Sequence, residues 1–163
     1  MDDERFSETV DYVAVRRLQN AYADVVTRRA WPELADLFRP DAVVEVDTRR
    51  DEPLRFVGPE ALGAFIGQSM TRFEFFEFVI LNTRIEIASN GNADVSVGRM
   101  YMCELRTERA TGEWTNAFGV YHDRYARVDG RWWFAHRQYH SLARTGEGAG
   151  VFDFPHHLTL DGL

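Results

Sequence analysis

The stretch FGVYHDRYARVDGRWWFAHR, residues 118–137, decides the fold. Two long segments rich in aromatic and β-branched residues flank the pair Asp129-Gly130. An Asp-Gly pair between such segments is typical of a tight antiparallel hairpin. We therefore predict two long antiparallel strands joined by this turn.

Strand-like segments of the same kind precede this hairpin. Asn90-Gly91 and Thr111-Gly112 separate them and have the same turn chemistry as Asp129-Gly130. The predicted strands of the resulting meander are residues 76–87, 93–107, 113–128 and 131–142.

The N-terminal part of the chain has a helical period. Apolar residues recur at helical spacing from Tyr12 to Ala30, and a short second helix is predicted around residues 34–38, before a strand at 42–46. Pro59 marks the start of a third helix. Three helices followed by a meander predict an α+β domain, a curved antiparallel sheet packed against the helices. A single domain is expected over residues 1–163, with 143–163 as a lid or tail.

Composition excludes several functions. The chain has 163 residues, a net charge of −7 and 19 basic residues that are all arginine, which removes lysine Schiff-base chemistry. The scattered arginines argue against nucleic acid, and no apolar run is long enough for a membrane helix. The acidic start lacks the features of a signal peptide, so a cytoplasmic location is expected. With Cys103 as the only cysteine and no metal-ligand or nucleotide-loop spacing, we expect neither a metal nor a cofactor.

A curved sheet with helices across its concave side leaves a cone that can bind a small apolar molecule. Alternation along the strands divides them into two faces. The inward set is predicted to be Met100, Met102, Glu104, Arg106, Gly119, Tyr121, Asp123, Ala135, Arg137 and Tyr139. Trp132, Phe134 and His136 would then face outward, and so apolar an outer face suggests a homodimer.

The order of these elements resembles the NTF2-like superfamily, and within it the SnoaL-like branch that includes scytalone dehydratase. The resemblance rests on residues 21–46, on 118–137, on NTR at 82–84 and on FDF at 152–154. It implies a cone-shaped fold whose C-terminal segment closes the pocket, so that Phe152 and Phe154 would form a lid. The alternative is a tail held on the outer surface.

The resemblance also implies catalytic positions. The six dehydratase positions fall on Val26, Thr27, Val46, Phe78, Arg106 and Tyr121, and none retains the family's residue. The same dehydration mechanism is therefore not expected. Tyr22 matches the helix-one tyrosine of ketosteroid isomerases, which share the fold.

We expect a cofactor-independent lyase, isomerase or cyclase that moves a proton on a small apolar cyclic molecule, such as a polyketide-, steroid- or aromatic-like one. The candidate catalytic residues are Tyr22, Tyr121, Asp123, Arg137 and Tyr139. The candidate substrate-binding residues are Val46, Phe78, Met102, Arg106, Phe152 and Phe154. Asp123 and Arg137 could instead be a structural pair, and Glu104 with Arg106 a solvated pair at the rim. The alternative function is a non-catalytic ligand-binding protein, or a structural subunit resembling the small subunit of ring-hydroxylating dioxygenases.

Overall fold

The computed structural model describes residues 2–163, with side chains from residue 5 onward. Its helical elements are α1 (Asp2–Arg28), the 3-10 helix η1 (Trp31–Asp36), α2 (Pro59–Met70) and the short 3-10 turns η2 (Ser89–Gly91) and η3 (Leu160–Gly162). No helix of the described part has both the length and the apolar character needed to span a bilayer.

The strands form one curved, mixed sheet of seven strands in the order β2-β1-β6-β5-β4-β3, with β7 paired to β6. They are β1 (Phe38–Asp47), β2 (Leu54–Val57), β3 (Phe73–Ile87), β4 (Val95–Glu108), β5 (Trp114–Val128), β6 (Arg131–Arg144) and β7 (Gly150–Val151). The predicted meander is confirmed as β3 to β6, which pair antiparallel in sequence order.

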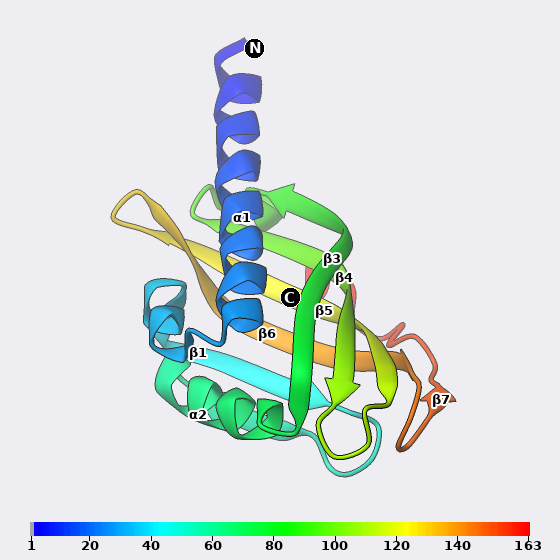
Figure 1. Cartoon of the computed structure of the whole chain (residues 1–163). Coiled ribbons are helices and arrows are strands. Elements are labelled where there is room, and N and C mark those ends of the chain that lie inside the picture. Colours follow the sequence, from blue (N-terminus) through cyan, green and yellow to red (C-terminus); the bar gives the residue numbers. More distant parts are fainter. Residues whose placement is uncertain (1) are drawn as a thin grey trace.

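The two long helices lie on the concave face of the sheet, with α1 crossing it and α2 running below β1 (Figure 1). Helix α1 buries Val15, Leu18, Tyr22, Val25 and Val26 against the strands. The Thr27 hydroxyl accepts a hydrogen bond from the backbone N–H of Phe78 at 3.0 Å, which ties the C-terminal end of α1 to β3. The α+β architecture predicted from the sequence is therefore correct.

The beginning of α2 has a local cause. Gly58 precedes it with φ of +82°, a conformation that side chains disfavour, and a Cβ there would lie 2.8 Å from the carbonyl oxygen of Pro40. Pro59 then takes the first helical position, as the sequence predicts.

The edge formed by β1 and β2 differs from the prediction. Strand β1 begins at Phe38 and pairs with β6 in parallel, whereas an all-antiparallel sheet was expected. Strand β2 was not predicted at all; it pairs antiparallel with β1. Only the first error concerns segments that are distant in the sequence, because β2 follows β1 after the short loop at residues 48–53.

The prediction that the side chains of Trp132 and Phe134 face outward is wrong. Both are buried, and the ring of Phe134 stacks on Phe38 at 4.7 Å between centroids. The cause is a bulge: Asp123 pairs with Arg137 but Tyr125 pairs with Phe134, so β6 has an extra residue at this point. Phe134 and Arg137 therefore face the same side of the sheet.

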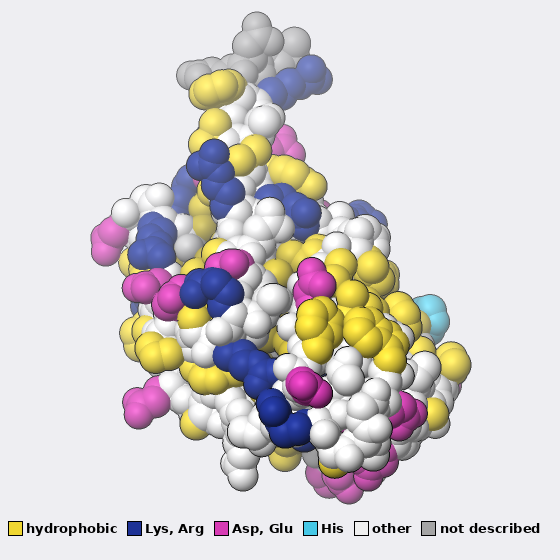
Figure 2. All heavy atoms as spheres, in the orientation of Figure 1, with side chains coloured by type: hydrophobic (Ala, Val, Ile, Leu, Met, Phe, Trp, Pro, Cys, Tyr) yellow, Lys and Arg dark blue, Asp and Glu magenta, His cyan; other side chains and the backbone are white. Residues whose placement is uncertain are grey.

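Exposed apolar side chains gather elsewhere, on the outer side of β3 to β5. Phe75 and Trp114 stack there at 5.6 Å between centroids, and Leu81 and Phe118 are also exposed. Hydrophobic side chains form a patch over this side of the molecule (Figure 2). Trp132 and Phe134 are therefore not available as the outer apolar face from which a homodimer was expected.

Candidate active site

A cavity of about 250 Å³ lies between α1, α2 and the concave face of the sheet. Most of its wall is apolar, with Val44 and Val46 of β1, Leu62 of α2, and Phe73 and Phe78 of β3 among the lining residues. Its polar side chains are those of Tyr22, Thr48, Ser69, Arg72, Glu104, Arg106, Tyr121, Tyr139, Ser141 and Arg144. A hollow of this composition suits an apolar molecule that carries a few polar groups.

Three phenols meet at the floor of this cavity. The ring centroids of Tyr22 and Tyr121 are 6.2 Å apart, and those of Tyr121 and Tyr139 are 5.0 Å apart. Burial raises the pKa of each of these tyrosines above its usual value, so all three stay protonated and able to donate hydrogen bonds. The structure brings together the three tyrosines named from the sequence.

Asp123 and Arg137 are not part of the cavity wall. Both side chains are fully buried and form a bidentate ion pair, with Nε–Oδ1 at 2.7 Å and Nη2–Oδ2 at 2.8 Å. Tyr125 donates a further hydrogen bond to Oδ2 at 2.9 Å and itself accepts one from Gln19 at 2.7 Å. Because donors occupy both oxygens of Asp123, the expectation that it carries a proton to a ligand is corrected: this acid belongs to a buried structural network.

Arg137 contacts the cavity only through the phenols. Its Cζ atom lies 4.2 Å from the ring centroid of Tyr22, 4.1 Å from that of Tyr121 and 4.2 Å from that of Phe134. Cation–π contacts at this distance in a dry environment are among the stronger ones. The guanidinium therefore packs against the rings of Tyr22 and Tyr121 and is not itself among the groups that line the cavity.

Glu104 is the carboxylate of the cavity. It is the only acidic residue among those that line it, and its side chain is 18 % exposed. Burial raises the pKa of the Glu104 carboxyl, while Arg106, with its Nη1 3.3 Å from Oε2, acts in the opposite direction. The carboxylate is close enough to raise the pKa of Tyr22, Tyr121 and Tyr139.

The sequence interpretation missed this role. Strand alternation correctly placed Glu104 and Arg106 on the inner face, but their position near a strand end favoured a solvated rim pair. Strand β4 continues to Glu108, and Arg106 stacks on Phe73 with Cζ 5.0 Å from the ring centroid. Glu104 and Arg106 both line the cavity.

The candidate substrate-binding residues divide into two groups. Val46, Phe78 and Arg106 line the cavity. Met102 is fully buried on the inner face but is not among the lining residues, so it supports the wall from within the core.

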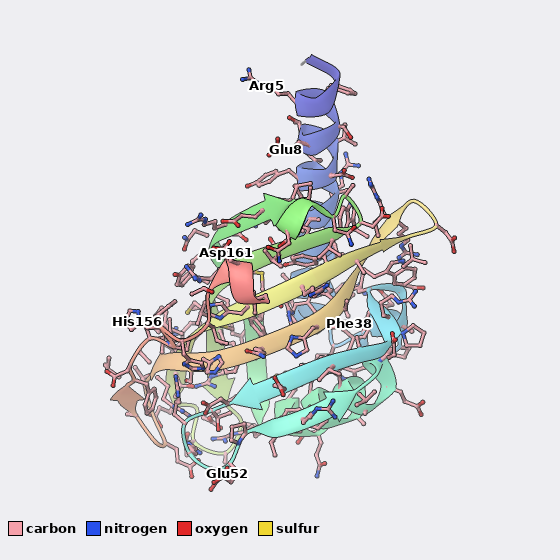
Figure 3. All side chains as sticks on the ribbon, turned by 180° about the vertical axis from the view of Figure 1, so that it is seen from behind. Arg5, Glu8, Phe38, Glu52, His156 and Asp161 are labelled. Atoms are coloured by element: carbon pink, nitrogen blue, oxygen red, sulfur yellow. The ribbon has the colours of Figure 1, made fainter. Side chains whose placement is uncertain are left out.

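The C-terminal phenylalanines are also outside the cavity wall. Phe154 stacks on Tyr101 at 6.4 Å and lies 6.0 Å from the ring of His122, and both of these residues belong to the outer face of the sheet. Seen from behind, the segment carrying His156 and Asp161 crosses the sheet on the side away from the helices (Figure 3). Phe152 packs against Arg144, and the Cζ atom of Arg144 lies 5.0 Å from the ring centroid of Phe152. The predicted lid is therefore corrected for Phe154, which packs on the outer face of the sheet, whereas Phe152 packs against Arg144, one of the lining residues of the cavity.

Comparisons with known proteins agree with this architecture. A family model described as a SnoaL-like domain matches residues 7–138. No curated protein matches. One similar solved structure is a candidate scytalone dehydratase from Novosphingobium aromaticivorans, with TM-score 0.75, 21 % identity and coverage of 93 % of this chain and 95 % of that one.

Two further structures share the fold. A hexachlorocyclohexane dehydrochlorinase from Novosphingobium barchaimii has TM-score 0.72 and 22 % identity, with 93 % of this chain and 99 % of that chain covered. An NTF2-like superfamily protein from Salmonella enterica has TM-score 0.66 and 17 % identity, with coverage of 84 % and 94 %. At these identities the likeness concerns the fold.

Proposed function

Because the chain belongs to the SnoaL-like domain family, whose model covers most of its length, we propose that it is a cofactor-independent enzyme acting by proton transfer. Its substrate would be a small, largely apolar cyclic molecule with a carbonyl group, bound in the cavity between the helices and the sheet. Elimination, isomerisation and cyclisation all begin with such a transfer.

One observation carries this proposal: among the lining residues of the cavity, Glu104 is the single carboxylate, and three phenols line the same cavity. A general base works best when its pKa lies near the working pH, and burial moves the pKa of Glu104 in that direction. The ion pair with Arg106 holds the carboxylate in place and favours its charged form.

The phenols supply the complementary part of the mechanism. When Glu104 removes a proton next to a carbonyl, negative charge develops on the carbonyl oxygen. Tyr22 and Tyr121 are protonated and pack against Arg137, so their hydroxyls can donate hydrogen bonds to that oxygen. Glu104 then returns the proton to another carbon, or a leaving group departs.

The names of two structural neighbours fit this reaction class. A dehydratase and a dehydrochlorinase both remove a small molecule from a substrate. None of the dehydratase residues is retained here, so the present chain would use its own acid and phenols.

The test begins with a thermal-shift screen of cyclic ketones. Any ligand found is then incubated in D₂O, and exchange of the proton next to its carbonyl is followed by NMR. Glu104→Gln should slow exchange about 100-fold or more while retaining binding. Tyr22→Phe should also slow exchange, because it removes an oxyanion donor.

Glu77→Gln is the matched control, since Glu77 is exposed on β3 and lies outside the cavity. It should exchange protons like wild type. Ligand binding without exchange in any of these proteins would support the non-catalytic alternative, a protein that only carries or senses its ligand. Normal exchange in Glu104→Gln would remove this acid from the mechanism.

A further inference from the structure

A second, smaller hollow of about 90 Å³ adjoins the mouth of the cavity. Arg72, Arg106 and Arg144 line both hollows, so the two are neighbours. Arg50, Glu108, Thr145 and Glu147 complete the smaller one. Four arginines thus gather at one opening of a chain whose net charge is −7.

Two of these arginines are already neutralised by acids. Arg72 makes a bidentate pair with Glu108, with Nε–Oε2 at 3.0 Å and Nη2–Oε1 at 2.8 Å. Arg106 contacts Glu104 at 3.3 Å. Their charges are therefore balanced within the site.

The other two have only backbone partners. Arg50 donates to the carbonyl of Glu147, and Arg144 donates to the carbonyl of Thr48. Among the described residues, neither guanidinium lies within 4.0 Å of a carboxylate. In addition, the Nε–H of Arg144 is buried and lacks a hydrogen-bond partner within the described chain. A buried donor left without a partner is costly, and a ligand oxygen would remove that cost.

The electrostatics agree with the geometry. Burial and the nearby charges of Arg50 and Arg106 lower the pKa of Arg144, so this guanidinium experiences a surplus of positive charge. The charge of Arg144 is also close enough to lower the pKa of Glu104 and of Tyr139. The cationic mouth therefore lies close enough to Glu104 and Tyr139 to influence their charge.

We propose that the substrate is a carboxylic acid, with its ring in the apolar cavity and its carboxylate at the mouth between Arg144 and Arg50. A guanidinium presents paired N–H donors that match the two oxygens of a carboxylate. This inference deepens the function proposed above and rests on it for the identification of the cavity as the substrate site.

The experiment compares two probes of nearly equal shape, naphthalene-2-carboxylate and its neutral amide, by isothermal titration calorimetry. Wild type should bind the carboxylate at least about tenfold more tightly, and the preference should decrease as salt is added. Arg144→Gln should lose most of the preference, whereas Arg144→Lys should keep part of it. Arg50→Gln should weaken the preference without any risk to folding, because Arg50 is exposed.

Arg84→Gln is the matched control: its side chain is 69 % exposed, it pairs with Glu86 and it lies outside both hollows. It should retain the full preference. Circular dichroism confirms that each variant is folded. A wild-type protein that does not prefer the carboxylate, including one that binds neither probe, overturns the inference, and so does a preference that survives in both Arg144→Gln and Arg50→Gln.

These experiments test the proposed anion site and the proposed proton transfer separately. Glu104→Gln should keep the preference for the carboxylate, since it removes no cation. If the preference is present but no protein exchanges a substrate proton, the anion site stands and the proposed proton transfer does not.

Discussion

Arg137 donates two hydrogen bonds to Asp123, at 2.7 and 2.8 Å, in a position where neither side chain reaches solvent. The same guanidinium packs against the rings of Tyr22 and Tyr121. The pair therefore connects the buried polar network of α1 and β5 to the floor of the cavity.

Replacing Asp123 with Asn should lower the free energy of unfolding by about 3–5 kcal/mol, because it leaves Arg137 charged, buried and without its acid. Urea denaturation measures the change. Asp94→Asn is the control: Asp94 pairs with Arg127 at 2.9 Å but is 66 % exposed, so its loss should cost less than about 1 kcal/mol. An Asp123→Asn protein that is as stable as wild type and has lost all turnover would restore Asp123 as the proton carrier.

The rate of proton exchange should depend on pH through Glu104. Only the ionised carboxylate can accept a proton, so kcat/KM should fall as the pH drops through the pKa of this group. Burial raises that pKa above its ordinary 4.5, and the acid limb of the profile should therefore lie above pH 4.5. An acid limb at or below pH 4.5 would mean that another group is the base.

Glu104→Gln should be less active than wild type but more stable at high pH. The native pKa is raised, so ionising Glu104 costs stability, and this cost grows as the pH rises from 4.5 through the native pKa. Because glutamine does not ionise, the variant should be more stable than wild type at pH 8 and should lose that advantage near pH 4.5. Urea denaturation at the two pH values tests this, with Glu77→Gln expected to show no such difference.

Phe154→Ala should affect stability and not ligand binding. The ring is half-buried on the outer face against Tyr101 and His122, and Arg99 lies above it with Cζ 5.3 Å from the centroid. Its loss should cost about 1–2 kcal/mol by denaturation, with ligand affinity changed by less than about twofold. Val151→Ala, at an 87 % exposed position, should leave both unchanged. A large loss of affinity in Phe154→Ala would support the lid that the sequence suggested.

The outer face also contains a group that responds to acid. Burial lowers the pKa of His122 to about 4, with smaller contributions from Arg99, His140 and His157. The unfolded chain takes up this proton near pH 6.5 but the folded chain only near pH 4, so stability should decrease as the pH falls from 6.5 toward 4.

His122→Gln tests this origin, since the variant should be less sensitive to pH between 6.5 and 5, above the range where most carboxylates titrate. His140, whose pKa burial also lowers, should account for part of the slope that remains. His136→Gln is the control, because His136 is 29 % exposed and lies outside this cluster. An unchanged slope in His122→Gln would assign the acid sensitivity to other groups.

The meander could be predicted from the sequence because its determinants are local. Alternation marks each strand, and a glycine-containing pair marks each turn. The first long helix was equally visible from its apolar spacing, although α1 begins at Asp2 rather than near Tyr12. The parallel pairing of β1 with β6 depends on contacts between distant segments, which no local pattern records. Strand β2 pairs with its sequence neighbour β1, but it is only four residues long and was not recognised.

The errors in the site have two causes. The bulge next to Ala135 inserts one residue into β6, and alternation alone cannot reveal an insertion, so Phe134 was placed on the wrong face. The second cause concerns acids: Asp123 and Glu104 both point inward, and only their neighbours show which is already occupied. Residue type and strand alternation could not distinguish the buried, paired Asp123 from Glu104, which lines the cavity.

The ion pair of Asp123 and Arg137 behind the phenols also determines how the charge of Arg137 responds to pH. Burial alone would lower the pKa of Arg137, but Asp123 outweighs that effect and raises it, so the guanidinium keeps its proton throughout the range in which the protein folds. The rings of Tyr22 and Tyr121 thus pack against a side chain that stays positively charged. Under the proposal above, substitutions at the arginine-rich entrance change which molecules bind and leave this buried charge in place.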